Sequence, residues 1–90
     1  MVKFEATTEA AEILALQALE FIASDPRRLT IFLSLTGLSP QDVAASAGDR
    51  PFLAGVLDHL LTNESMLVEF CTLNNIRPEE PARAHARLIA

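Results

Sequence analysis

The chain has 90 residues, half of them apolar, and a formal net charge of −5. This length favours a single domain over residues 1–90, and the apolar fraction is too high for a disordered chain. The acidic balance disfavours nucleic acid and anionic membranes as partners, because both carry negative charge.

Capping residues and prolines predict a succession of six helices. Threonine, aspartate, serine and asparagine stand where helix N-caps are expected, and proline stands at first helical positions. Gly37 and Asn75 follow two of the helices, at points where a left-handed residue ends a helix. Because Pro81 lacks an amide hydrogen, the last helix begins either at Pro78 or at Pro81. The expected helices cover about residues 8–23, 26–36, 40–48, 50–61, 64–74 and the stretch from residue 78 or 81 onwards.

The chain matches itself when it is shifted by about 38 positions. Core positions, caps and turn residues all recur at this one offset, which ordinary helix patterns do not readily produce. We therefore predict a duplicated unit, about residues 14–48 and 52–86, with two independent helical hairpins as the alternative. The matching residues are Leu19, Leu29, Phe32, Leu35, Pro40 and Ala44 in the first copy and Leu57, Leu67, Phe70, Leu73, Pro78 and Ala82 in the second.

The first and fourth expected helices are apolar over most of their circumference. A helix on a protein surface normally shows a broad polar face, whereas these two show only a narrow one. They are expected either at the centre of the fold or at an interface with another chain, and we favour the centre. The predicted fold is therefore all-α: an orthogonal or irregular bundle of five to six short helices, built from two helix–helix–short helix units.

Three segments carry a resemblance to a known family. They read A-L-Q-A-L-E-F-I-A-S-D-P from Ala15, F-L-S-L-T-G-L-S-P-Q-D-V from Phe32 and F-L-A-G-V-L-D-H-L-L from Phe52. In these segments the chain resembles a family of short bacterial proteins named domain of unknown function thirty-five seventy-two. The resemblance implies a bacterial protein of the cytoplasm. It implies no activity, ligand or catalytic residue.

The first residues of the chain do not resemble a signal peptide, since acids interrupt the apolar stretch and no basic segment precedes it. No run of about 18 apolar residues occurs, so no membrane span is expected. The single cysteine, Cys71, excludes an internal disulfide and is expected to be a small buried apolar residue. Together these features favour a cytoplasmic location.

A helix-turn-helix is the strongest specific alternative. The segment Val43–Gly48 places small residues and a glycine as such a turn requires, and the helix from Arg50 to Leu61 would then read DNA. That helix is expected to present basic and polar side chains. It offers mainly Arg50, Asp58 and His59, so a short helix ended by glycine is the preferred interpretation.

No constellation of residues points to catalysis, a cofactor or a metal. Asp58 and His59 are adjacent on a helix and therefore diverge, which prevents them from orienting each other. His59 is expected at the edge of the apolar face, and His85 in solvent between two arginines. One cysteine and two distant histidines do not form a zinc-binding pattern. We therefore expect a protein that is not an enzyme and has no cofactor.

Four residues are the candidates for contact with a partner. Arg27 and Arg28 stand in the first turn of a helix, where the dipole disfavours cations, so either an acid of the same domain or an acidic partner is expected opposite them. Leu16 and Ile31 are expected to be exposed apolar residues. The favoured function is a protein-interaction or regulatory module, with a homodimer or another protein as partner.

Overall fold

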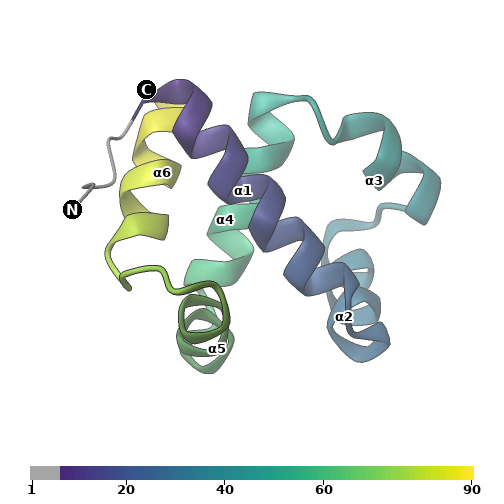
Figure 1. Ribbon diagram of the computed structural model, residues 1–90. Helices are drawn as coiled ribbons and strands as arrows, with labels where there is room; N and C mark the ends of the chain where they lie inside the picture. The colour runs from purple at the N-terminus through teal and green to yellow at the C-terminus, as the bar shows by residue number, and fades with distance from the viewer. Residues whose placement is uncertain (1–6) are drawn as a thin grey trace.

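The computed structural model describes residues 7–90 and contains the six helices in the expected order (Figure 1). No strand occurs in this part of the chain, so the all-α prediction is confirmed. The helices are α1 (Thr8–Ala23), α2 (Pro26–Thr36), α3 (Pro40–Ser46), α4 (Arg50–Leu61), α5 (Glu64–Asn74) and α6 (Glu80–Ile89).

Side-chain hydrogen bonds cap the N-termini of four helices. The Thr7 hydroxyl accepts a hydrogen bond from the Ala10 amide at 3.1 Å, and Asp25 accepts one from the Arg27 amide at 2.8 Å. At α3 the cap is reciprocal, because Ser39 and Asp42 each accept the other's amide hydrogen. The hydrogen bond that the Ser39 amide donates to the Asp42 carboxyl, together with the Ser39 hydroxyl, lowers the pKa of that carboxyl below its ordinary value of 3.8. The fourth cap, at α5, is Asn63.

Two helix ends and one cap differ from the expectation. The N-cap residue Asp49 makes no side-chain hydrogen bond, although α4 begins where predicted. Helix α3 ends at Ser46, shortly before Gly48. Helix α6 begins at Glu80, so Pro81 lies in the first turn, where its missing amide hydrogen breaks no helical bond.

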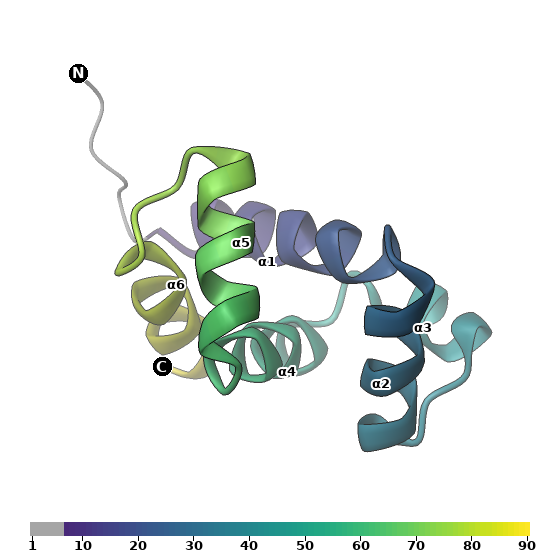
Figure 2. The same cartoon turned by 90° about the horizontal axis from the view of Figure 1, so that it is seen from below.

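The core lies between α1, α4 and α6. Helices α1 and α4 cross each other, and α6 packs along both (Figures 1 and 2). Alanines on the contact faces allow the helix axes to approach closely. The buried residues of α1 are Ala11, Leu14, Ala15, Ala18, Phe21 and Ile22, and those of α4 are Leu53, Ala54, Val56, Leu57 and Leu60.

Residues at the repeat offset make equivalent contacts. Phe21 on α1 packs edge-to-face on Phe70 of α5, with ring centroids 5.5 Å apart. His59, the counterpart of Phe21 on α4, packs in the same way on Phe32 of α2, at 5.1 Å. Such crossed contacts are what two copies related by a two-fold rotation would make. The duplication itself stays a prediction.

The two turns that end α2 and α5 also correspond. Gly37 and Asn75 both adopt the left-handed conformation, with φ values of 74° and 54°. Among residues 7–90, Asn75 is the one non-glycine residue with positive φ. Asparagine tolerates this conformation better than other residues with a side chain, which explains its position here.

The third helix of each unit differs between the two halves. Helix α6 buries Pro81, Ala84 and Leu88. Helix α3 has no buried residue and packs closely with neither α1 nor α4. The first half of the molecule is consequently more open than the second.

Candidate functional site

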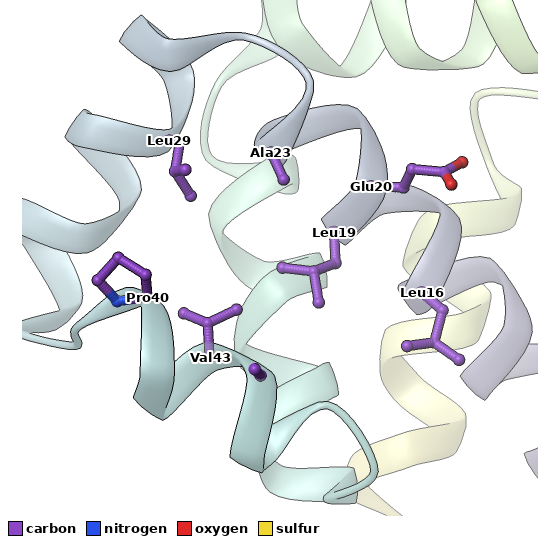
Figure 3. Close-up of a pocket in the computed structure, with 8 residues that line it drawn as sticks. Leu16, Leu19, Glu20, Ala23, Leu29, Pro40 and Val43 are labelled. Atoms are coloured by element: carbon purple, nitrogen blue, oxygen red, sulfur yellow. The ribbon is translucent and has the colours of Figure 1, made fainter.

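An apolar groove lies where α3 stands away from α1 (Figure 3). Its volume is about 360 Å³, near the lower end of the range for binding pockets in proteins. The lining residues are Leu16, Leu19, Glu20 and Ala23 of α1, Leu29 of α2, and Pro40, Val43 and Ala44 of α3. This cluster is called the α1–α3 groove below.

Apolar side chains converge at the centre of the α1–α3 groove. Figure 3 shows Leu19, Leu29 and Val43 directed toward one another from three different helices. Leu19 and Val43 are partly buried and pack against the core, while Leu16 remains 43% exposed at one edge. An apolar hollow whose walls are held by three helices is suited to receive apolar side chains from outside.

Glu20 is the one charged residue in the groove lining. Its carboxylate extends from α1 away from Leu19, Leu29 and Val43 (Figure 3). Within residues 7–90 no arginine or histidine forms an ion pair with it. The groove therefore combines an apolar floor with an anionic edge.

The four candidate contact residues fall into three places. Leu16 lies at the α1–α3 groove. Arg27 and Ile31 line a separate shallow depression on α2, with Pro26 and Thr30, of about 340 Å³. Ile31 is 56% exposed, as its sequence position indicated. The sequence thus identified two exposed surfaces rather than one continuous site.

Arg28 is directed into its own domain. Its guanidinium forms an ion pair with Glu69 of α5 at 3.3 Å and approaches Asp25 at 3.9 Å. It also stacks over the ring of Phe21, 4.0 Å from the centroid. Of the two alternatives for this arginine, the structure shows pairing with acids of the same domain. Arg28 thereby connects α2 to α5.

Sequence reasoning missed most of the groove. Leu29, Pro40, Val43 and Ala44 were read only as ordinary helix, cap and core positions. A usable signal did exist, because α3 carries apolar residues on a helix too short to bury them fully. Its distance from α1 depends on tertiary packing, which no local pattern reports.

A family model matches residues 8–90, nearly the whole described chain. Its description is "Protein of unknown function (DUF3572)". The chain belongs to the DUF3572 family. Comparison with curated proteins and comparison with solved structures each gave no significant match.

The remaining titratable candidates of this DUF3572 protein lie apart from the groove lining. His59 is half-buried against Phe32, and desolvation lowers the pKa of its imidazole, while the nearby Asp58 charge opposes that shift. Cys71 is buried, and burial, together with Glu80 and Glu79, raises the pKa of its thiol. Among residues 7–90 no group of three or more histidine, cysteine or acidic side chains is placed to bind a metal ion.

The proposed DNA-reading helix of this DUF3572 protein is the central helix of the fold. Helix α4 contacts α1, α5 and α6 and buries five of its residues. Its exposed side chains include Arg50, which pairs with Glu12 at 3.1 Å, and the acidic Asp58. A recognition helix must project far enough to enter a major groove. Helix α4 is therefore packed within the bundle, and its exposed arginine is paired with an acid of the same domain.

In the part of the chain that the structure describes, no helix combines the length and apolar character needed to cross a bilayer.

Proposed function

We propose that this DUF3572 protein is a non-catalytic protein-interaction module of the cytoplasm that binds an amphipathic helix of a protein partner in the α1–α3 groove. The observation that supports this proposal most directly is the groove itself, an open apolar hollow at Leu16, Leu19 and Val43 beside a single anionic residue.

The chemistry of the groove defines the partner. Apolar side chains of the partner would lie against Leu19, Leu29 and Val43, and removal of this surface from water would supply the affinity. A lysine or arginine of the partner would lie at the rim opposite Glu20. A charge at the rim fixes register and speeds association more than it adds affinity. The partner is therefore an amphipathic helix with a basic residue beside its apolar stripe.

A photo-activated cross-linking amino acid at Ala44 tests this proposal in the native cells. Ala44 is exposed and lines the groove. Thr72, exposed on α5 outside the groove lining, gives the matched control position. Position 44 should cross-link to a protein, and the Leu16→Glu substitution should abolish this cross-link. The circular dichroism and melting temperature of the Leu16→Glu variant should match those of the parent. The cross-linked peptide should be amphipathic and basic.

Two results would contradict the proposal. One is equal cross-linking from positions 44 and 72, which would show that capture does not depend on the groove. The other is an unchanged cross-linked product in a folded Leu16→Glu variant. A cross-link to DNA from position 44 would instead favour the helix-turn-helix alternative.

A further inference from the structure

Helix α3 is held to the rest of the bundle by few contacts. It buries no residue and packs closely with no other helix of the described chain, whereas each of the other five helices does both. Val43 is the one apolar side chain of α3 that packs against the core, and it is only partly buried. Figure 1 shows α3 at the edge of the molecule, with a connecting segment on either side. An element with so few buried contacts opens locally at a low free-energy cost.

The polar contacts of α3 are local as well. Ser39 and Asp42 cap its first turn, and the Asp49 amide donates a hydrogen bond to the Ser46 carbonyl at 2.8 Å. Within residues 7–90 no side-chain hydrogen bond or ion pair joins Pro40–Ser46 to another helix. These contacts stabilise α3 as a helix, but they do not attach it to α1.

The weak docking of α3 has a cause in the sequence. Helix α6, which stands at the equivalent place in the second half, buries Ala84 and Leu88. At the repeat offset the first half has Ser46 and Arg50 in these two places. Arg50 already belongs to α4 and pairs with Glu12 at 3.1 Å. Helix α3 therefore lacks the apolar side chains by which α6 docks.

Glycines stand in both connections of α3. Gly37 precedes the helix and Gly48 follows it, so two of the three glycines of the chain flank this one helix. Both are exposed, and a Cβ atom at either would meet nothing within 4 Å. No packing therefore requires glycine at these positions, whereas glycine does leave the backbone of each connection free to change direction.

The α1–α3 groove is narrow for a helix. Its volume of about 360 Å³ lies near the lower end of the range for pockets that bind small molecules. A helix with its side chains is about 10–12 Å across, and its apolar anchors extend over about two turns. Val43 and Ala44 form the α3 wall of the groove. Outward displacement of α3 would widen it.

We propose that α3 is a flap that opens about Gly37 and Gly48 and so controls entry to the α1–α3 groove. Opening withdraws Val43 from Leu19 and Leu29, toward which it is directed in the structure (Figure 3). A helix of seven residues is too short to be stable once it leaves the bundle, so opening also breaks the hydrogen bonds within α3. This inference rests on the proposed function and adds a means of regulating the same groove.

Amide hydrogen exchange of the native chain, measured by nuclear magnetic resonance, tests the opening. Protection factors in residues 43–46 should be about a hundredfold or more below those in residues 84–88, because α3 opens without unfolding of the whole chain. Low concentrations of urea should reduce protection in α6 and scarcely affect α3, since opening of α3 exposes little surface.

Substitution of Val43 tests its part in holding the flap. Val43→Thr keeps the branched shape of the side chain and places a hydroxyl in an apolar contact, so it should lower protection in α3 about fivefold or more. Val68→Thr makes the same chemical change at a position on α5 that is 54% exposed. This control variant should leave protection in α3 unchanged.

Gly48→Ala connects the flap to binding. Gly48 lies outside the groove lining, and alanine restricts the backbone at one end of α3. Protection in α3 should rise about two- to fivefold, and the yield of the cross-link from position 44 should fall by a similar factor.

The outcomes separate this inference from the proposed function. Amides of α3 that are as protected as those of α6, or that respond to urea as steeply, would overturn the inference. So would equal effects of Val43→Thr and Val68→Thr, or a Gly48→Ala variant that protects α3 without reducing the cross-link. In each of these cases the proposed function would still stand if the cross-link from position 44 depended on Leu16, and it would fail if the cross-link did not.

Discussion

His59 packs edge-to-face on Phe32, with ring centroids 5.1 Å apart and an angle of 76° between the ring planes. Phe21 packs on Phe70 in the other half of the molecule with a similar geometry, at 5.5 Å and 64°. A histidine thus occupies the position in the second half that a phenylalanine occupies in the first. This difference introduces a titratable group at a contact that is otherwise apolar.

The contact between His59 and Phe32 should make stability depend on pH. Desolvation lowers the pKa of folded His59 from its ordinary value of 6.5, and the Asp58 charge offsets part of this shift. Unfolding therefore takes up a proton at pH values between the two pKa values. The contribution of His59 to the free energy of unfolding should be constant above pH 6.5. It should fall as the pH drops from 6.5 toward the pKa of His59 in the folded protein.

Urea denaturation between about pH 7.5 and pH 5 checks this dependence. The His59→Phe variant should show a flatter profile than the parent, because it restores the ring found at Phe21. Identical slopes for the parent and His59→Phe would show that His59 is not the source.

The buried phenylalanines should contribute strongly and similarly to stability. Phe32 and Phe70 are 1% and 0% exposed, so Phe32→Ala and Phe70→Ala should each cost about 3–5 kcal/mol. Leu35 is 72% exposed, and Leu35→Ala should change the free energy of unfolding by less than about 0.5 kcal/mol. Urea denaturation measures all three. A cost for Leu35→Ala that equals the cost for Phe32→Ala would contradict this assignment of the core.

Two glycine substitutions should have opposite effects. Gly37 has a φ of 74°, and a Cβ atom there would meet nothing within 4 Å, so Gly37→Ala should destabilise through backbone strain alone, by about 1–2 kcal/mol. A Cβ atom at Gly48 also meets nothing, and its φ is not positive. Gly48→Ala should therefore be neutral or stabilising by up to about 1 kcal/mol. Thermal unfolding of both variants measures the difference between their melting temperatures. That difference would be absent if Gly37 did not adopt the left-handed conformation.

The ion pair between Arg28 and Glu69 should couple α2 to α5 modestly. The two side chains are 22% and 55% exposed, and solvent weakens such a pair. A double-mutant cycle with Arg28→Met and Glu69→Gln should give a coupling energy of about 0.5–1 kcal/mol that declines in high salt. Arg28→Met alone should cost more than Glu69→Gln, because it also removes the stacking on Phe21. Equal single-variant costs would exclude a contribution from that stacking.

Cys71 should react slowly with thiol reagents in the folded protein. The side chain is buried, and its raised pKa reduces the thiolate fraction at neutral pH. Alkylation monitored by mass spectrometry should be slow in buffer and fast in denaturant. Rapid alkylation of the native chain, at the rate of a free cysteine, would show that Cys71 is accessible.

The helices were predictable because their caps are local. Ser39 and Asp42 form their reciprocal cap within one turn, and Gly37 ends α2 through its own φ preference, so neither depends on the rest of the fold. The start of α6 was left open between Pro78 and Pro81, and the helix begins at Glu80. These short-range signals determine most of the helix bounds.

The candidate site could not be predicted, because it depends on distances between helices. Leu16 was expected to be an exposed apolar residue, and it lies at the groove. Val43 and Ala44 complete the groove only because α3 stands away from α1, and that separation follows from the packing of the whole bundle. For Arg28 the sequence left open whether an acid of the same domain or an acidic partner lies opposite it. The position of Glu69 beside Arg28 decides this, and that position depends on tertiary packing.

The central claim is that the α1–α3 groove is a contact surface for a protein partner, and cross-linking from inside the groove tests it most directly. The account predicts a protein cross-link from position 44 that position 72 does not give and that the Leu16→Glu substitution abolishes. Equal cross-linking from both positions, or a product that persists unchanged in a folded Leu16→Glu variant, would contradict it.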